Sequence, residues 1–155
     1  MKKVLTFFLF VFLLVSCQKE EEFKPSPYLL TDKNGNPVPL PKDKLIVLNF
    51  MAYSCSACMK EMPVMKKVIK EKPFKDKFQI IGMVIDSDEG DLSDPLFPIY
   101  PSSSQNFVRF PVPGTPTTYI ITPEGKKLVI IYGAVTEENF RKFLFQALKK
   151  AKKSK

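Results

Sequence analysis

Histidine and tryptophan are absent from this sequence of 155 residues, and cysteine occurs only three times. Without an imidazole, the chain cannot form a Ser-His-Asp triad or a Cys-His pair, because both need histidine to accept the proton of the nucleophile. Attachment of a c-type haem is excluded as well, since it needs histidine directly after a C-x-x-C pair. A structural zinc site needs about four Cys or His ligands, more than this chain can gather. These absences leave few kinds of site that its cysteines can form.

Two of the cysteines, Cys55 and Cys58, lie close together in the segment SCSAC, and the third, Cys17, lies far upstream. Such a pair either carries electrons as a reversible dithiol and disulfide or binds a soft metal ion such as Cu(I). Methionines at positions 51, 59, 62 and 65 are compatible with copper, but methionine is also an ordinary core residue. Dithiol chemistry and copper binding both remain open on these residues alone.

The N-terminus, MKKVLTFFLFVFLLVSC, has the features of an export signal. Its apolar run from Val4 to Val15 follows two lysines and is shorter than the roughly 20 residues that a membrane-spanning helix needs. The final LVSC resembles the lipobox of bacterial lipoproteins. That resemblance implies that residues 1–16 are removed and that Cys17 carries a lipid, which would anchor the protein to a membrane. Residues 17–27 are charged and contain proline, so we expect a flexible tether there.

The remaining chain is long enough for one folded domain, which we expect over residues 28–150, followed by a basic tail over residues 151–155. Hydrophobic runs and turn residues predict its strands and helices. We expect edge strands or a hairpin at 28–31 and 38–40, and strands at 45–52, 78–85, 117–122 and 127–132. One helix should begin at the cysteines, and another should be capped by Thr136. Strands that alternate with helices in this way are typical of an α/β layer fold.

The cysteine pair therefore falls at a junction between a buried strand and a helix. The first turn of a helix has unpaired N–H groups and the positive end of the helix dipole, both of which stabilise a thiolate. We expect Cys55 to be the exposed, attacking thiolate and Cys58 to be the buried, resolving thiol. Ser56 is a candidate hydrogen-bond donor to the Cys55 thiolate.

The segment NFMAYSCSACMKEMP resembles the NFWATWCPPCRKEMP signature of bacterial envelope thioredoxin-like proteins of the TlpA and ResA type. GTPTTYIITPEGK resembles a second segment of the same family. The resemblance implies a thioredoxin-like three-layer fold, with a central mixed sheet flanked by helices. It also implies that Cys55 and Cys58 are the redox pair, that Pro116 is a cis-proline, and that the Thr115 backbone binds substrate. No cofactor is implied.

The sequence departs from this family signature at positions beside the cysteines. Met51 and Ser54 replace the two tryptophans, which reduces the apolar surface next to Cys55. Asn49 stands where thioredoxin has a buried aspartate that assists the proton of the resolving cysteine. Because an amide cannot accept that proton, we expect water or an acid such as Glu61 to do so.

The function expected from these features is a thiol-disulfide oxidoreductase of the cell envelope that reduces disulfides in exported proteins, for example apocytochrome c. A membrane protein of the thiol-disulfide type would supply the electrons. One alternative is a Cu(I)-binding or copper-delivery protein, and another is a thiol oxidase or isomerase that uses the same chemistry. The acidic segment 86–94 lacks the spacing of a calcium loop, so no metal site is expected there. No base-reading motif indicates nucleic acid.

Overall fold

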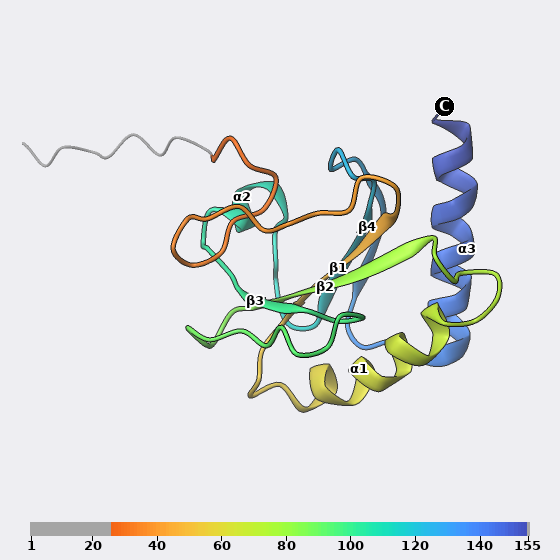
Figure 1. The fold of residues 1–155 in the computed structure, drawn as a ribbon. Helices are drawn as coiled ribbons and strands as arrows, with labels where there is room; N and C mark the ends of the chain where they lie inside the picture. Colours follow the sequence, from red (N-terminus) through yellow and green to blue (C-terminus); the bar gives the residue numbers. More distant parts are fainter. Residues whose placement is uncertain (1–25, 155) are drawn as a thin grey trace, which may run out of the picture.

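The computed structural model describes residues 26–154, so the predicted signal segment, Cys17 and most of the tether lie outside it. Figure 1 shows the arrangement of five strands and three helices within these residues. The elements in chain order are β1 (Leu45–Met51), α1 (Ser56–Ile69), β2 (Phe78–Val84), β3 (Ile99–Pro101), α2 (Asn106–Arg109), β4 (Thr117–Ile121), β5 (Lys127–Tyr132) and α3 (Glu137–Lys153). No helix within residues 26–154 is both long and apolar enough to cross a bilayer.

The five strands form one mixed sheet in the order β3-β2-β1-β4-β5. β1 runs parallel to β2 on one side and antiparallel to β4 on the other, and this register places Asn49 between Gly82 and Thr118. Six of the seven residues of β1 are buried, as its continuous apolar run predicted. β4 and β5 form the predicted antiparallel pair.

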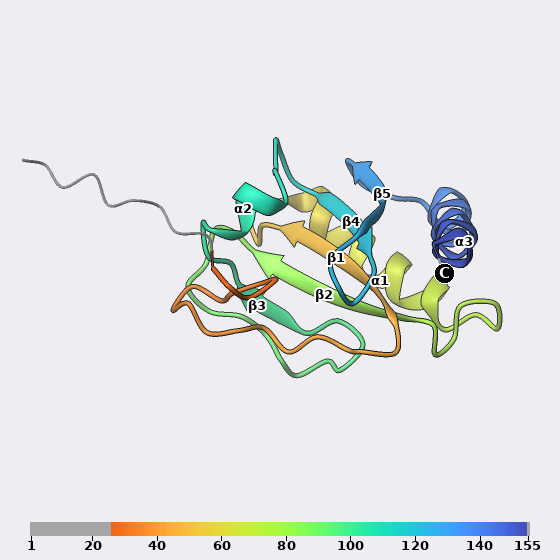
Figure 2. The same cartoon turned by 90° about the horizontal axis from the view of Figure 1, so that it is seen from above.

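The sheet separates two apolar cores, and these define the layers of the fold (Figure 2). One core lies between the sheet and the helices α1 and α3, which contact each other. The other core lies under α2 and the segment that precedes β1, with Leu30, Val38 and Phe110 among its buried members. The fold is therefore the predicted α/β arrangement with a central mixed sheet flanked by helices, although its second face is covered mostly by irregular chain.

Both long helices begin with a side chain that caps their free N–H groups. Cys55 is the N-cap residue of α1, and its sulfur accepts from the backbone N–H of Cys58. Thr136 caps α3 in a reciprocal capping box with Asn139, as its position before the helix predicted. α3 continues to Lys153, which lies inside the segment predicted as a basic tail.

Residues 28–31 and 38–40 form no strands of the sheet, so the expected edge strands were wrong, whereas the alternative, a hairpin, is present in a minimal form. Thr31 forms an isolated antiparallel bridge with Pro37, and the backbone N–H of Val38 donates to the carbonyl oxygen of Leu30 over 3.0 Å, across a turn at Gly35, where φ is 81°. The physical reason is the proline content of PVPLP, because Pro37, Pro39 and Pro41 have no N–H to donate to a neighbouring strand.

Candidate functional site

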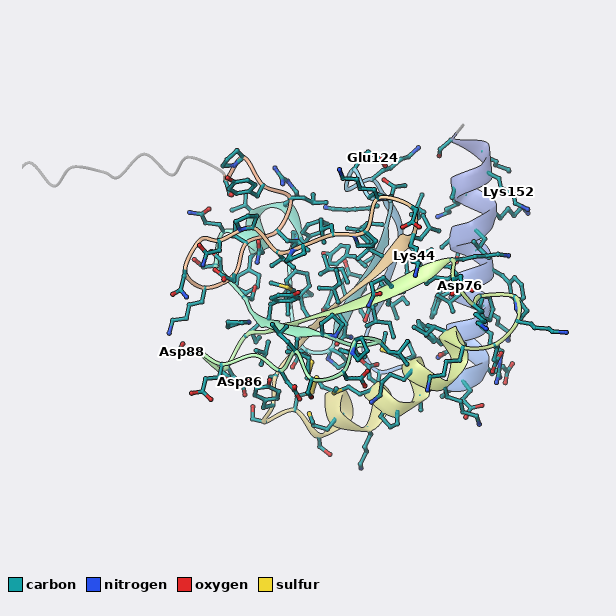
Figure 3. The ribbon with its side chains drawn as sticks, viewed as in Figure 1. Lys44, Asp76, Asp86, Asp88, Glu124 and Lys152 are labelled. Carbon is teal, nitrogen blue, oxygen red and sulfur yellow. A yellow bond between two sulfur atoms is a disulfide. The ribbon has the colours of Figure 1, made fainter. Side chains whose placement is uncertain are left out.

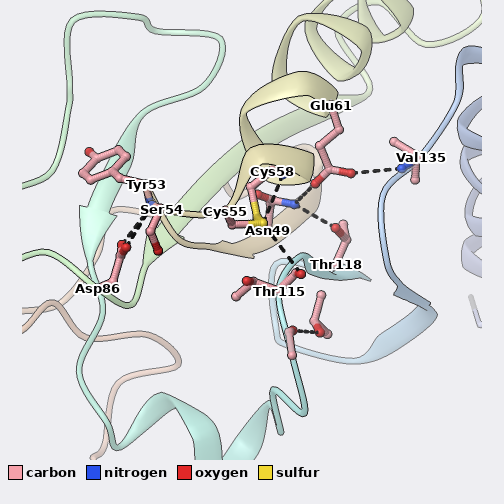
Figure 4. Close-up of a disulfide and its surroundings, with 12 residues drawn as sticks. Asn49, Tyr53, Ser54, Cys55, Cys58, Glu61, Asp86, Thr115, Thr118 and Val135 are labelled. Atoms are coloured by element: carbon pink, nitrogen blue, oxygen red, sulfur yellow. Dashed lines mark hydrogen bonds between the residues drawn. A yellow bond between two sulfur atoms is a disulfide. The ribbon is translucent and has the colours of Figure 1, made fainter.

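The cysteines Cys55 and Cys58 are joined by a disulfide at the junction where β1 leads into α1 (Figure 4). Their Cα atoms lie 5.3 Å apart. Cys58 is fully buried in the core beneath α1, whereas Cys55 is partly exposed, which is the asymmetry expected from the sequence. The backbone N–H of Cys58 donates to Cys55 Sγ over 3.2 Å. The helix start therefore supplies a donor to the more accessible sulfur, while the side chain of Ser56 is exposed.

The loop before β4 faces this disulfide from a distant part of the chain. Its Thr115-Pro116 peptide bond is cis, as predicted. The carbonyl oxygen of Thr115 lies 3.7 Å from Cys55 Sγ. A hollow of about 280 Å³ opens beside it, lined by residues 113–117 together with Tyr132 and Gly133. Because Tyr132 is 66% exposed, this hollow has an accessible aromatic wall next to the backbone of the loop.

A buried polar network lies beneath the first turns of α1. Glu61 is only 2% exposed, and its carboxylate accepts hydrogen bonds from Asn49 Nδ2 over 2.8 Å and from the backbone N–H of Val135 over 3.0 Å. Asn49 Nδ2 also donates to Thr118 Oγ1 over 2.9 Å. Burial raises the pKa of Glu61, and the hydrogen bonds from Asn49 and Val135 oppose that rise in part.

Glu61 follows Cys58 by one turn of α1, and both side chains are buried on the face of the helix that packs on the sheet. A raised pKa makes the Glu61 carboxylate a stronger proton acceptor than the carboxylate of an ordinary glutamate. The structure thus brings together the buried cysteine and the acid that the sequence suggested as its proton partner.

Asp86 was not predicted as a site residue, because the acidic segment 86–94 indicated only that a calcium loop is not expected there. Its carboxylate accepts hydrogen bonds from the backbone N–H groups of Tyr53, over 2.8 Å, and Ser54, over 3.0 Å. The bonds from Ser54, and then the bond from Tyr53, lower the pKa of Asp86. In Figure 3, Asp86 lies at the end of the molecule where α1 begins, opposite the end that carries Lys44 and Lys152. Asp86 therefore fixes the backbone immediately before Cys55.

The signal for this role was the position of Asp86 directly after a buried strand. Parallel strands end at the same edge of a sheet, so a polar side chain that follows β2 lies close to the residues that follow β1. The methionines show no such convergence: Met51 and Met65 are buried in the core, whereas Met59 is 43% exposed. Within residues 26–154, no three Cys, Asp or Glu side chains are grouped as a metal ion would require.

Comparison with known proteins agrees with the fold. The sequence pattern of the Thioredoxin-like domain matches residues 38–148. The chain belongs to the thioredoxin-like family. Thiol-disulfide oxidoreductase ResA of Bacillus thuringiensis is 30% identical over 140 residues, which cover 82% of this chain and 79% of that protein. Thioredoxin-like protein YneN of Bacillus subtilis is 31% identical over 112 residues, 66% of this chain and 65% of that protein.

Solved structures share the fold of this thioredoxin-like chain. StoA from Bacillus subtilis superimposes with a TM-score of 0.56 at 19% identity, covering 77% of this chain and 96% of StoA. The exposed lipoprotein thioredoxin of Streptococcus pneumoniae superimposes with a TM-score of 0.58 at 22% identity, covering 76% of this chain and 96% of the other. Together with the Cys55–Cys58 disulfide, the family identifies the protein as a thiol-disulfide oxidoreductase of the ResA type.

Proposed function

We propose that this protein is an extracytoplasmic dithiol reductase that transfers electrons from Cys55 and Cys58 to disulfides of exported proteins. The observation that carries the proposal is the modest support for a Cys55 thiolate: the backbone N–H of Cys58 and the start of α1. The two intervening residues are Ser56 and Ala57, neither of them cationic. Strong oxidants of this family stabilise the reduced form through an unusually stable thiolate. The surroundings of Cys55 favour a reductant instead.

The reaction begins when the Cys55 thiolate attacks one sulfur of a substrate disulfide. A mixed disulfide forms, and the other substrate sulfur leaves as a thiolate. Cys58 then gives its proton to the Glu61 carboxylate and attacks Cys55 Sγ. The enzyme disulfide forms, the second substrate sulfur leaves, and two electrons have passed to the substrate. The hollow beside Thr115 and Pro116 supports the placement of a substrate segment against Cys55.

The proposed substrates are oxidised cysteine pairs of exported proteins, with apocytochrome c as one example suggested by the family resemblance. A membrane protein of the thiol-disulfide type would return the enzyme to its dithiol state. We propose that Cys17, which lies outside the described residues, holds the domain at the membrane through a lipid. Incorporation of labelled fatty acid that disappears in Cys17→Ala is the expected result. An unlabelled mature protein that begins at another residue would contradict the anchor.

Mixing the protein with a peptide that contains two cysteines tests the reductase proposal. The dithiol protein should convert the disulfide peptide to its dithiol, and Cys58→Ser should stop at a mixed disulfide. Acid quenching followed by mass spectrometry distinguishes these species. If the disulfide form of the protein readily oxidises the dithiol peptide, while the dithiol form leaves the disulfide peptide intact, the protein is an oxidase.

A further inference from the structure

The side-chain carbonyl oxygen of Asn49, Oδ1, is buried without a hydrogen-bond partner. Among the residues that the structure describes, Asn49 Oδ1 is the one buried side-chain nitrogen or oxygen atom in this condition. Buried polar groups in folded proteins nearly always have a partner, so each exception calls for a physical explanation. The whole Asn49 side chain is inaccessible to solvent, which means that bulk water does not satisfy this oxygen.

The orientation of the Asn49 amide follows from its neighbours. Nδ2 donates to Glu61 Oε1 over 2.8 Å and to Thr118 Oγ1 over 2.9 Å. Turning the amide over would place Oδ1 against a carboxylate oxygen, and two acceptors would then face each other. The contact with Glu61 therefore fixes Nδ2 on that side and leaves Oδ1 directed elsewhere.

The Asn49 side chain lies on the side of the sheet that packs under α1. Along β1, Asn49 shares its face with Val47 and Met51, which pack in the same core as Cys58. Its partner Glu61 follows Cys58 by one turn on α1. In the view of Figure 4 the Asn49 side chain overlaps the disulfide, and its nitrogen is turned toward Glu61 and Thr118. In the disulfide state neither sulfur carries a proton, so neither cysteine can donate a hydrogen bond to Oδ1.

Reduction supplies the missing donor, because Cys58 then carries an S–H group. We propose that Asn49 Oδ1 accepts a hydrogen bond from the Cys58 thiol in the reduced protein, which makes Asn49 a positioning residue for the resolving cysteine. The same amide then contacts both groups of the proton transfer, the thiol through Oδ1 and the Glu61 carboxylate through Nδ2. The inference deepens the proposed function, since it rests on Cys58 as the resolving thiol.

Infrared spectroscopy of the S–H stretching band tests this bond directly. The full chain with Cys17→Ala and Cys55→Ser retains Cys58 as its only thiol, because the sequence has three cysteines. With Asn49 present, the band should lie at the lower wavenumber of a hydrogen-bonded thiol, and Asn49→Leu should shift it upward. Thr118→Val is the matched control: it removes a neighbour of Nδ2 and leaves Oδ1, so the band should not move. The same S–H band position in the protein with Asn49 and in the Asn49→Leu variant would overturn the proposal.

A second measurement needs no variant and covers the case in which Asn49→Leu does not fold. The infrared difference spectrum between the disulfide and dithiol states, recorded with isotope-labelled asparagine, should show one asparagine carbonyl band that moves to lower wavenumber on reduction. An asparagine spectrum that is unchanged by reduction would overturn the proposal. Neither measurement uses a substrate, so both results stand even if the protein proves to be an oxidase.

The redox equilibrium gives a third readout. Asn49→Leu removes a hydrogen-bond acceptor that only the dithiol state uses, so the disulfide state should become more stable relative to the dithiol state. In glutathione buffers the equilibrium constant should move toward the disulfide by roughly two- to five-fold, the size expected for one weak neutral hydrogen bond. A shift toward the dithiol would contradict the proposed bond.

Discussion

Replacing Glu61 with glutamine separates the two chemical steps of the dithiol. The substitution keeps the size of the side chain but removes the carboxylate that accepts from Asn49 and Val135. Loss of a general base typically slows the step it serves by roughly a hundred-fold or more. Attack by Cys55 does not need Glu61, so only the attack by Cys58 should slow by about that factor.

A chromogenic aromatic disulfide resolves the two steps in one stopped-flow trace. Attack by Cys55 releases the first coloured thiolate, and attack by Cys58 on the mixed disulfide releases the second. Glu61→Gln should leave the first phase unchanged and slow the second by roughly a hundred-fold. An unchanged second phase, or equal slowing of both phases, would refute the role of Glu61 as proton acceptor.

The pH dependence provides an independent check on the same residue. Burial raises the pKa of Glu61, so the wild-type second phase should accelerate as pH rises through that raised value and the carboxylate forms. Glu61→Gln should lose this acceleration. Glu61 also keeps its proton to a higher pH in the folded state than in the unfolded state. Its contribution to the free energy of unfolding is therefore greatest in acid and declines as pH rises through the folded pKa. The wild type should therefore lose unfolding free energy relative to Glu61→Gln over that range.

Three further substitutions test other parts of the structure. Cys58→Ser should accumulate mixed disulfides with substrates, whereas Cys55→Ser should not; capture by Cys55→Ser alone would reverse the two roles. Asp86→Ala should lower the melting temperature at neutral pH, because it leaves two N–H groups before Cys55 without their acceptor. The pKa of Asp86 is lowered in the folded state, so this difference from the wild type should vanish in strong acid. Leu144→Ala, at a fully buried position of α3, should cost about 2–5 kcal/mol in urea denaturation, and a loss below about 1 kcal/mol would show that the core between α3 and the sheet tolerates a cavity.

The central elements of the fold were predictable because their sequence patterns reflect burial directly. The apolar run of β1 is buried on both faces of the sheet, and the spacing of Phe140, Leu144 and Ala147 matches the buried face of α3. The edge strands expected before β1 do not form, because Pro37 and Pro39 have no N–H groups to donate to a neighbouring strand. The availability of backbone N–H donors therefore decides which apolar segments join the sheet.

The candidate site was predictable only where its residues are close in sequence or lie in a recognisable motif. Recognisable motifs contain Cys55, Cys58 and Pro116, and the structure has the expected disulfide and the expected cis peptide bond. Val135 is 74 positions from Glu61, and nothing in its own residue type indicates that its N–H binds a carboxylate. Such contacts follow from packing α1 against the start of α3, which no local pattern encodes.

The reduction potential of the Cys55–Cys58 couple tests the proposed direction of electron flow most directly. It is obtained by equilibrating the full chain, with Cys17→Ala to exclude the third thiol, in glutathione or dithiothreitol buffers and quantifying the two redox states. The modest thiolate support at Cys55 predicts a value nearer the roughly −270 mV of thioredoxin than the roughly −120 mV of DsbA. A potential near that of DsbA, with the protein found as the disulfide in cells, would contradict a reductase and identify an oxidase.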